Sequence, residues 1–366
     1  MGAMRRVALL LYTLALLMGL QRASANETTQ RSPPSSPTQH WQPHPAAQSS
    51  ADCRRDLDDV SRYLKRLDTT SLMAAKDGMA LFTYGPVAET SIVFSVRKSI
   101  LAMLYGNYVE QGQIDLNATL GGLDVDDIGG LLPPERAARV VDLLESRSGV
   151  FHPAANSGDD LAQAPARGSQ PPGAYFLYNN WDFNAAGTAF ERLTGVGIYD
   201  AFLQDIARPI QLEDYEHRRH RKMGDRSKSQ HLAYPFYLSA RDMARIGQLM
   251  LRNGDWNGQP VMSPAWTRSI VALRTPAADM HPPATARRGL GYGRMWWLIE
   301  TPPPSPLAGA YMAWGVHGQF ILVIPGRNMV IAHKRRVPVG TNWNVSWVRV
   351  TDFFKAAEQL ASARCG

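Results

Sequence analysis

Four consecutive residues, Ser95-Val96-Arg97-Lys98, carry the clearest chemical signal in the sequence. They read S-x-x-K and lead into an apolar stretch, Ile100 to Tyr108, that predicts a helix. At the start of a helix, residues i and i+3 lie on one face, so the Lys98 amine can reach the Ser95 hydroxyl. A serine becomes a good nucleophile when a neighbouring base takes its proton. The pattern indicates an activated serine, and the alternative is a surface Ser and Lys at a helix start.

A second candidate for a functional motif is Tyr178-Asn179-Asn180, which precedes a predicted helix. A lysine ammonium stabilises a nearby phenolate, so we expect Lys98 to lower the pKa of Tyr178. Tyr178 could then exchange protons with the serine and with the leaving group. Asn180 could hold Lys98 or a substrate amide. The alternative is an ordinary turn with a half-buried tyrosine.

A third candidate is the stretch from Ala313 to Gln319, which leads into a predicted strand. Its small residues would let a substrate lie close to the backbone. A backbone N–H from this stretch, paired with that of Ser95, can form an oxyanion hole. The alternative is a glycine-rich segment that only leads into the strand.

The elements that must position these residues follow a simple order along the chain. Strands come early, helices in the middle, and strands with one helix at the end, which favours an α/β (α+β) sheet domain with an inserted helical domain. The predicted strands are Met79–Tyr84, Tyr292–Ile299, Gln319–Ile324 and Met329–Lys334. The predicted helices are Asp56–Leu67, Arg136–Glu145, Phe183–Leu193, Ala240–Arg252 and Trp347–Ala363.

The N-terminal residues 1–25 predict a secretory signal peptide. Arg5 and Arg6 precede an apolar run from Val7 to Leu20, and Ala23-Ser24-Ala25 has the A-x-A pattern of a cleavage site. The apolar run is short for a membrane span, although an uncleaved anchor is the alternative. We therefore expect an exported protein, in a bacterial periplasm, with no stable membrane span after cleavage.

Residues 26–52 are rich in Ser, Thr, Gln and Pro and predict a disordered linker. We expect residues 53–366 to form the folded domain. We expect its sheet part to cover about 53–105 and 285–366, and its helical part to cover about 106–284, as the order of elements implies.

Composition limits the partners and cofactors. The formal net charge of +7 falls to +4 without the three arginines of the signal segment, which gives no support for a nucleic-acid partner. His217 and His220 lack further close ligands, so we expect no metal. The chemistry implied by the family resemblance given below needs no other cofactor. Cys53 and Cys365 could form one disulfide in an oxidising compartment, or remain free thiols. The sequence leaves the oligomeric state open.

Taken together, the motifs resemble the serine β-lactamase and penicillin-recognising superfamily. Within it, the chain is most similar to the class C-related branch, which includes 6-aminohexanoate-dimer hydrolases and family VIII carboxylesterases. The resemblance covers about residues 55–360, with an antiparallel sheet flanked by N- and C-terminal helices as the implied fold. It rests on five segments in the family's order: Phe94–Ser99, Gly112–Leu116, Leu143–Val150, Tyr178–Asn184 and Ser239–Arg245.

The resemblance implies a serine hydrolase that cleaves a small-molecule amide or ester through an acyl-serine. Ser95 would be the nucleophile, Lys98 its activating partner and Tyr178 the general base. The backbone N–H groups of Ser95 and Val316 would stabilise the oxyanion, and Asn180 would orient polar groups. The implied site residues are Ser95, Lys98, Tyr178, Asn180, Gly315, Val316 and His317.

One departure from the superfamily's pattern concerns specificity. Its members usually carry K-T-G on the strand beside the site, where this chain has Ala313-Trp314-Gly315. Loss of that lysine disfavours β-lactams and favours esters or linear amides. Four other cations could replace its charge: Arg241, Arg288, Arg294 and Lys334.

Two alternatives stay open: a β-lactamase or penicillin-binding D,D-peptidase, and a catalytically inactive binding protein. An α/β-hydrolase is disfavoured because no G-x-S-x-G elbow occurs. We interpret Glu145, which lies at the end of a predicted helix, as a structural residue rather than a deacylating base. We expect specificity to depend on the loops Phe151–Gln170 and Glu213–Tyr237.

Overall fold

The computed structural model describes residues 36–37, 40–338 and 346–365. The predicted signal peptide, residues 1–25, lies outside these ranges. Within the described ranges, no helix is both long and apolar enough to cross a membrane.

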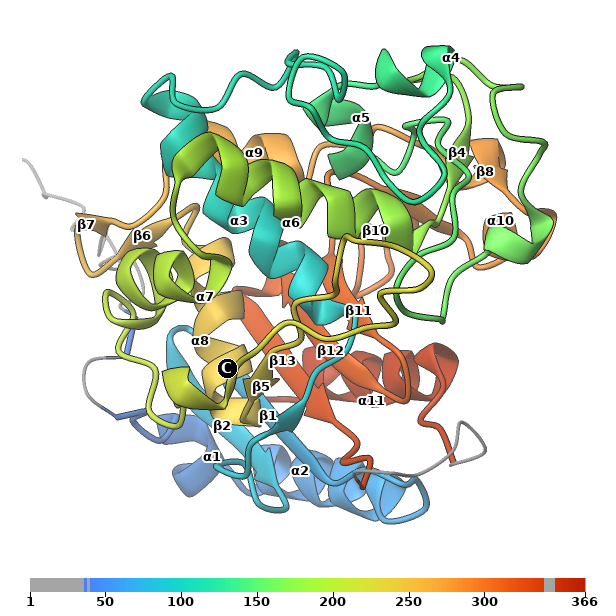
Figure 1. Cartoon of the computed structure of the whole chain (residues 1–366). Helices are drawn as coiled ribbons and strands as arrows, with labels where there is room; N and C mark the ends of the chain where they lie inside the picture. The colour runs from blue at the N-terminus through green and yellow to red at the C-terminus, as the bar shows by residue number, and fades with distance from the viewer. Residues whose placement is uncertain (1–35, 38–39, 339–345, 366) are drawn as a thin grey trace, which may run out of the picture. The chain divides into compact units, whose positions relative to one another are not determined.

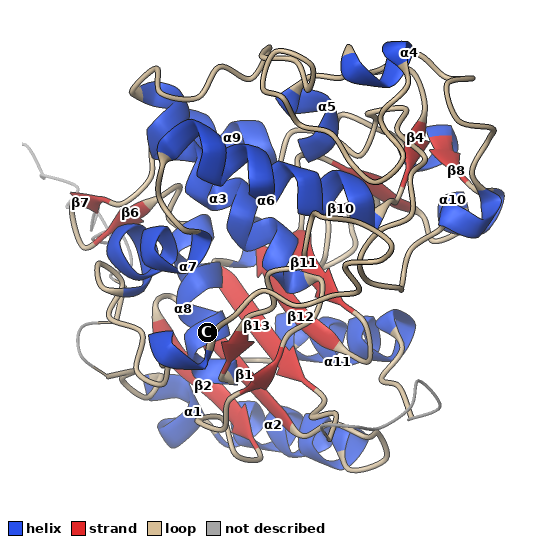
Figure 2. Ribbon diagram, viewed as in Figure 1, coloured by secondary structure: helices blue, strands red, loops and turns tan. Residues whose placement is uncertain are grey.

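A seven-stranded antiparallel sheet lies at the centre of the described fold, in the order β2-β1-β13-β12-β11-β10-β9 (Figures 1 and 2). The N-terminal hairpin β1–β2 joins the C-terminal strands through β1 and β13, so both ends of the folded region build one sheet. The strands are β1 Ser71–Lys76, β2 Met79–Tyr84, β9 Leu290–Tyr292, β10 Trp297–Ile299, β11 Tyr311–Gly315, β12 Gln319–Ile324 and β13 Met329–Lys334. Two-residue strands pair elsewhere: β3 Ser91–Ile92 with β5 Tyr237–Leu238, β4 Phe176–Leu177 with β8 Met280–His281, and β6 Asp255–Trp256 with β7 Gln259–Pro260.

Helices cover both faces of this sheet. A Cβ on Gly247 of α8 would meet Ile321 and Val330, whereas Phe353 of α11 stacks on Phe320. Because neighbouring strand residues point to opposite faces, α8 and α11 lie on opposite sides. The helices are α1 Pro45–Ser49, α2 Ala51–Leu64, α3 Val96–Glu110, α4 Pro133–Arg136, α5 Val140–Leu144, α6 Asn180–Thr194, α7 Ile198–Ala201, α8 Ala240–Leu251, α9 Pro264–Ile270, α10 Pro283–Ala286 and α11 Val350–Ser362.

The helix α3 leads from the sheet into the helical part, where α6 runs beside it (Figure 1). The N-terminal three turns of α3 are buried on every side, as expected for a helix without a polar stripe. Tyr105 donates a hydrogen bond to the Ala186 carbonyl on α6, with 2.7 Å between the oxygens. On another side, Trp266 of α9 donates to the Ala102 carbonyl at 2.9 Å. This burial holds the start of α3 in one position.

Several predicted elements are confirmed with the same or nearly the same bounds. Met79–Tyr84, Gln319–Ile324 and Met329–Lys334 are strands, and the predicted helix Ala240–Arg252 ends one residue earlier. The continuous strand predicted over Tyr292–Ile299 is wrong, because a turn separates β9 from β10. Met295 has φ +61° in this turn.

The single helix predicted over Arg136–Glu145 is also wrong. Arg139 has an extended backbone, with φ −99° and ψ 161°, and it separates α4 from α5. The Asp142 carboxylate accepts hydrogen bonds from both the backbone N–H and the guanidinium of Arg139. This cap starts a new helix, an arrangement that apolar periodicity alone does not reveal.

The linker predicted over residues 26–52 is wrong for its C-terminal part. Residues 40–52 contain α1 and the start of α2, and Trp41 packs against the core. The Ala80 amide donates to the Gln42 carbonyl, and the His44 amide donates to the Ala80 carbonyl. Contacts with the edge strand β2 therefore order a segment whose composition alone favours disorder.

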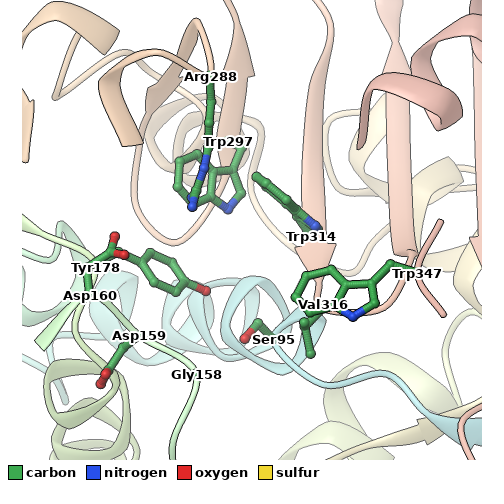
Figure 3. Close-up of a pocket in the computed structure, with 10 residues that line it drawn as sticks. All are labelled: Ser95, Gly158, Asp159, Asp160, Tyr178, Arg288, Trp297, Trp314, Val316 and Trp347. Carbon is green, nitrogen blue, oxygen red and sulfur yellow. The ribbon is translucent and has the colours of Figure 1, made fainter. Parts of the chain in front are cut away.

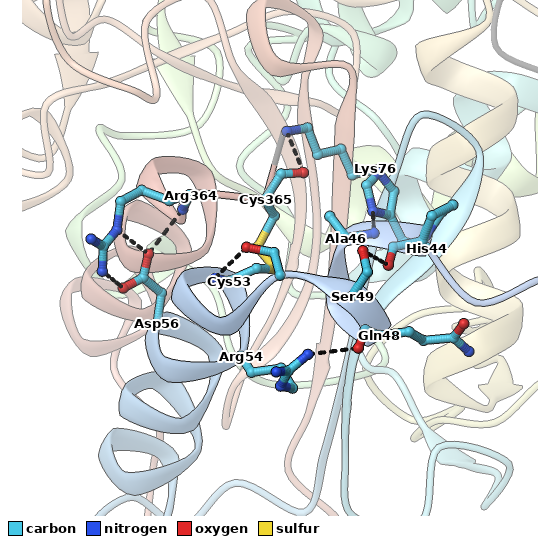
Figure 4. The surroundings of a disulfide bond; sticks show 12 residues. His44, Ala46, Gln48, Ser49, Cys53, Arg54, Asp56, Lys76, Arg364 and Cys365 are labelled. Carbon is cyan, nitrogen blue, oxygen red and sulfur yellow. Dashed lines mark hydrogen bonds and ion pairs between the residues drawn. A yellow bond between two sulfur atoms is a disulfide. The ribbon is translucent and has the colours of Figure 1, made fainter.

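The sequence left the state of the two cysteines open, and the structure pairs Cys53 with Cys365 (Figure 4). Both are buried, at 0% and 1% exposure, and they join the first turn of α2 to the end of α11. Beside them, the Arg364 guanidinium donates to the Asp56 carboxylate at 2.7 and 3.0 Å. The bond closes a loop with a sequence separation of 312 residues.

Removing this disulfide should destabilise the fold. A crosslink over a long loop restricts the unfolded chain, so we expect C53S/C365S to lower the free energy of unfolding by about 2–5 kcal/mol. Urea unfolding with and without reductant measures the effect, and the double variant, which has no bond to reduce, is the control. Equal stability of reduced and oxidised wild type would contradict the expectation.

Candidate active site

Ser95 stands at the start of α3 on a constrained backbone. Phe94, immediately before it, has φ +47°, a conformation that costs a non-glycine residue free energy and clusters at functional sites. The Val93 amide donates to the Phe236 carbonyl at 3.0 Å and ties the incoming chain to the loop before β5. These contacts hold the serine hydroxyl where α3 meets the sheet.

Lys98 and Tyr178 converge on Ser95. Lys98 Nζ lies 3.1 Å from Ser95 Oγ and 2.6 Å from Tyr178 Oη. Lys98 is 1% exposed, and its Nζ also lies over the rings of Tyr178 and Phe183, at 4.0 and 4.3 Å from their centroids. The three functional groups predicted from S-x-x-K and Y-x-N are therefore within proton-transfer reach of one another.

The electrostatics of this group differ from the expectation for Tyr178. Burial, with the Arg97 charge second, holds the pKa of Lys98 well below its ordinary value. Burial raises the pKa of Tyr178 to about 12, although a hydrogen bond with Ser95 and the charges of Arg97 and Arg288 act in the opposite direction. The expected lowering of the Tyr178 pKa is thus wrong, because desolvation outweighs the neighbouring cations. The arrangement favours a neutral amine beside a neutral phenol.

Aromatic packing fixes the Tyr178 ring. Tyr178 follows β4 and precedes α6, and its ring centroid lies 5.0 Å from that of Phe183 and 5.4 Å from that of Trp297. Asn179 caps α6 by accepting from the Trp181 amide at 2.9 Å, and donates to the Val150 carbonyl at 2.6 Å. The tyrosine is held between a capped helix and strand β10.

Asn180 lies beside the site rather than in contact with Lys98. Its side chain donates to the Ser157 carbonyl at 2.9 Å, and its backbone N–H donates to the Asp159 carboxylate at 2.9 Å. Asn180 therefore fixes the loop 157–159 through hydrogen bonds, and this loop lines the cavities described below. No hydrogen bond between Asn180 and Lys98 occurs in the described part of the chain.

The third predicted stretch comprises the end of β11, the turn that follows it and the first residue of β12, and it approaches Ser95. A Cβ added to Gly315 would lie 2.3 Å from the Val93 carbonyl oxygen and 3.2 Å from the Ser95 nitrogen. The backbones of the two segments are thus in close approach, and Val316 and Ser95 line the same cavities. The structure therefore places the backbones of Ser95 and Val316 at one junction beside the cavities.

His317 completes the turn and packs between two aromatic rings. It is 2% exposed and has φ +66°. Its ring centroid lies 5.2 Å from that of Phe94 and 5.0 Å from that of Trp347. The residues with positive φ on either side of the junction therefore contact each other through their rings. Burial lowers the pKa of His317, which keeps the ring neutral.

The close approach at Gly315 gives a direct prediction. Gly315→Ala places a methyl group against the Val93 backbone and forces Val316 away from Ser95, so kcat/KM should fall by about 100-fold. Gly326→Ala is the matched control, because a Cβ on Gly326 meets nothing within 4 Å. Steady-state kinetics on both variants, with thermal unfolding in parallel, test this. Full activity in folded Gly315→Ala would contradict the expectation.

Two cavities flank Ser95 and share Ser95, Gly158 and Val316 as lining residues. The first, of about 230 Å³, contains Tyr178 and is shown in Figure 3, where the Tyr178 hydroxyl points toward Ser95. Its further lining residues are Asp159, Asp160, Arg288, Trp297, Trp314 and Trp347. The second, of about 330 Å³, is lined by the loops around Asn156 and Met223 and includes Arg97. Both predicted specificity loops thus contribute to cavity walls.

Three of the four cations considered as replacements for the K-T-G lysine have partners elsewhere. Arg241 pairs with Asp214 at 2.5 Å, and Arg294 pairs with Glu145 at 3.1 Å. Lys334 is 2% exposed and donates to backbone carbonyls. The pair with Arg294 also supports the structural interpretation of Glu145.

Arg288 is the member of that group of four that lines a cavity beside Ser95. Its Cζ lies 5.3 Å from the Trp314 ring centroid, and Figure 3 shows it reaching in above Tyr178. Its charge lowers the Tyr178 pKa, although less than burial raises it. A cation is therefore available on the Tyr178 side of the site.

Sequence analysis missed several cavity residues. Asp159 and Asp160 lie inside a predicted specificity loop, but no motif marked them. Trp347 comes from the segment before α11, and Trp297 from β10, both far from Ser95 in sequence. Only the density of tryptophans near the C-terminus could have drawn attention to an aromatic wall.

Comparison with known proteins places this geometry in context. The sequence model of the Beta-lactamase family matches residues 60–333. Among solved structures, a Bacillus anthracis protein whose name proposes 6-aminohexanoate-dimer hydrolase activity aligns with TM-score 0.60 and 19% identity, over 82% of this chain and 79% of that one.

Two further structures share the fold. A penicillin-binding protein homologue from Caulobacter crescentus aligns with TM-score 0.56 and 16% identity, over 81% of this chain and 92% of that one. EstCE1, a hydrolase with promiscuous acyltransferase activity, aligns with TM-score 0.58 and 15% identity, over 86% of this chain and 99% of that one. At these identities the alignments establish the fold alone.

Proposed function

Because this chain belongs to the Beta-lactamase family, we propose that it is a serine hydrolase that cleaves an amide or ester through an acyl enzyme on Ser95. One observation carries the proposal. Lys98 Nζ lies within hydrogen-bond distance of both Ser95 Oγ and Tyr178 Oη, at the point where the two cavities meet. A catalytically inactive binding protein of the same fold would not require these three groups in this geometry.

Acylation follows from the pKa directions. Burial lowers the pKa of Lys98, which favours the neutral amine, and this amine accepts the Ser95 proton as Oγ attacks the substrate carbonyl. This assigns the base role to Lys98, where the family resemblance implied Tyr178. The negative charge that forms on the carbonyl oxygen is stabilised by the backbone N–H groups of Ser95 and Val316.

Collapse of the tetrahedral intermediate breaks the amide or ester bond. The departing amine or alcohol takes a proton from Tyr178, which Lys98 replaces, because the two groups are 2.6 Å apart. Water then attacks the acyl-serine, with the Lys98–Tyr178 pair as proton acceptor, and releases the acid. The residues named supply every proton transfer, so the proposal includes no cofactor.

Linear amides and esters fit the site better than β-lactams. The strand β11 carries Ala313 and Trp314 where penicillin-recognising enzymes place a lysine, so the substrate-carboxylate contact of those enzymes is missing at this position. A penicillin should therefore acylate Ser95 slowly or not at all. A β-lactamase or D,D-peptidase remains the second candidate, through the family match.

A substrate screen separates these candidates. Purified protein is assayed with nitrophenyl esters, linear anilides and benzylpenicillin, with Ser95→Ala as the blank in each case. We expect Ser95-dependent turnover of an ester or anilide at a kcat/KM well above that for penicillin. Faster turnover of penicillin, or a stable penicilloyl adduct, would contradict the assignment and support the second candidate.

Export is part of the proposal. The N-terminal charge, apolar run and A-x-A pattern support it, as does the Cys53–Cys365 disulfide, since such bonds persist in oxidising compartments. The mature protein recovered from the periplasm of a bacterial host should begin at Asn26. An intact N-terminus on protein retained in the cytoplasm would contradict export.

A further inference from the structure

The second cavity beside Ser95, here named the Arg97 cavity, has an apolar wall and one cationic residue. Its volume is about 330 Å³, within the range of small-molecule sites. The apolar lining residues are Ile92, Phe94, Met223, Ala233, Pro235 and Val316. Arg97 and Asn156 are its polar side chains of larger size. This composition suits an apolar group with a polar end.

Arg97 is held in place by neutral groups. It is 4% exposed, and its Nη2 donates to Asn184 Oδ1 at 2.7 Å. Asn184 in turn donates to Asn156 Oδ1 at 2.9 Å, and the guanidinium carbon lies 4.4 Å from the Tyr234 ring centroid. Nη1 is buried without a hydrogen-bond partner. No carboxylate pairs with Arg97 among the residues that the structure describes.

A buried cation with an unused donor is unfavourable unless something pairs with it. A guanidinium prefers a carboxylate, which accepts from it through short, charge-assisted hydrogen bonds. The contact with the Tyr234 ring and the bond to Asn184 fix the guanidinium of Arg97 and leave its Nη1 without a hydrogen-bond partner. Met223, 41% exposed and unbranched, forms part of the outer wall and can move aside for a ligand.

The position of Tyr178 decides which part of a substrate enters this cavity. Tyr178 lines the first cavity, and in the proposed mechanism it protonates the leaving group. The leaving group must therefore lie on the first-cavity side of Ser95. The acyl chain, on the other side of the scissile carbonyl, is then directed toward the Arg97 cavity.

We propose that the Arg97 cavity is the acyl subsite and that Arg97 binds a carboxylate at the far end of the acyl chain. The substrates it favours are amides or esters formed on one carboxyl of an aliphatic dicarboxylic acid. The inference rests on the proposed function for the position of the scissile bond. The anion subsite itself rests on the cavity and on the unpartnered Nη1 of Arg97.

Binding tests the subsite without turnover. Calorimetry on Ser95→Ala protein compares the monoamide of adipic acid with hexanamide, which differ by the terminal carboxylate. We expect the monoamide to bind about 10- to 100-fold more tightly, the usual gain from a charged hydrogen bond. S95A/R97M should bind both equally, and S95A/R97K should keep part of the preference. Equal affinities in Ser95→Ala itself would overturn the proposal.

Turnover tests the same subsite in the active protein. The mono-4-nitroanilide of adipic acid should exceed hexanoyl-4-nitroanilide by about 10- to 100-fold in kcat/KM, and Arg97→Met should remove this ratio. A change in Lys98 caused by the lost charge would affect both substrates alike, so the ratio isolates the contact. Arg288→Met is the matched control: it removes the other cavity's cation and should leave the ratio intact.

The outcomes separate the two proposals. Ser95-dependent turnover without a preference for the terminal carboxylate would overturn the subsite and leave the hydrolase assignment standing. A binding preference that depends on Arg97, with no Ser95-dependent turnover, would support the subsite and overturn the hydrolase assignment. A preference lost in Arg288→Met instead of Arg97→Met would place the anion in the first cavity and overturn the assignment of Arg97. Unfolding temperatures of each variant confirm that folded proteins are compared.

Discussion

Ser95→Ala should abolish turnover while leaving the fold intact. The variant removes the oxygen that forms the acyl bond, and loss of a serine nucleophile lowers kcat by about 10⁴- to 10⁶-fold. The hydroxyl accepts a hydrogen bond from Lys98 at 3.1 Å and interacts with the Tyr178 hydroxyl, so its loss should change the free energy of unfolding by about 1–2 kcal/mol. Steady-state kinetics and urea unfolding measure the two effects.

Ser99→Ala is the matched control for this experiment. Ser99 lies one turn further along α3 and donates to the Met295 carbonyl at 2.6 Å, so its loss should also destabilise the protein modestly. It does not contact the reacting groups, and turnover should persist. Residual activity in Ser95→Ala within 10-fold of wild type, a limit far above the loss expected for a missing nucleophile, would contradict the mechanism.

Lys98→Met should lower kcat/KM by about 10³- to 10⁴-fold, the upper part of the range for a general base. The lowered pKa of Lys98 also fixes the direction of the pH dependence. The amine must be neutral to accept a proton, so activity should rise as pH increases through the Lys98 pKa, which lies well below its ordinary value. This acidic limb should be absent from the residual activity of Lys98→Met.

Lys98→Arg separates base catalysis from charge. An arginine keeps a positive charge near Tyr178 but does not lose its proton in proteins, so it cannot accept one from Ser95. We expect Lys98→Arg to be as inactive as Lys98→Met. Near wild-type activity in Lys98→Arg would show that the position supplies charge, and the base would then have to be Tyr178.

The pair of Ser95 and Lys98 could be predicted from the sequence because its spacing is local. Ser95 and Lys98 lie one helical turn apart, and the strands Gln319–Ile324 and Met329–Lys334 are short, mostly apolar runs that are recognisable in the sequence. The prediction that Tyr178 and the Gly315–Val316 turn lie near Ser95 depended on the family resemblance, because no local sequence pattern shows that these segments meet. The structure places Tyr178 beside Lys98 and Gly315 next to the Ser95 backbone.

Properties that depend on tertiary burial could not be predicted in this way. The Tyr178 pKa rises because Phe183 and Trp297 exclude water from its ring, and the second of these is distant in sequence. Nothing in the sequence distinguished Arg97, the third residue of S-x-x-K, as a buried cation. Its neighbours Asn184 and Tyr234 come from other elements, and only their positions reveal a buried cation with an unused donor.

The most direct test of an activated Ser95 is the intact mass of the purified protein after treatment with a fluorophosphonate, which phosphonylates activated serines. Wild type should gain one adduct, Ser95→Ala none, and Lys98→Met far less in the same time. Peptide mapping should place the adduct on Ser95. Absence of an adduct on folded wild type, or equal labelling of wild type and Ser95→Ala, would contradict the proposal that Lys98 activates Ser95 for catalysis.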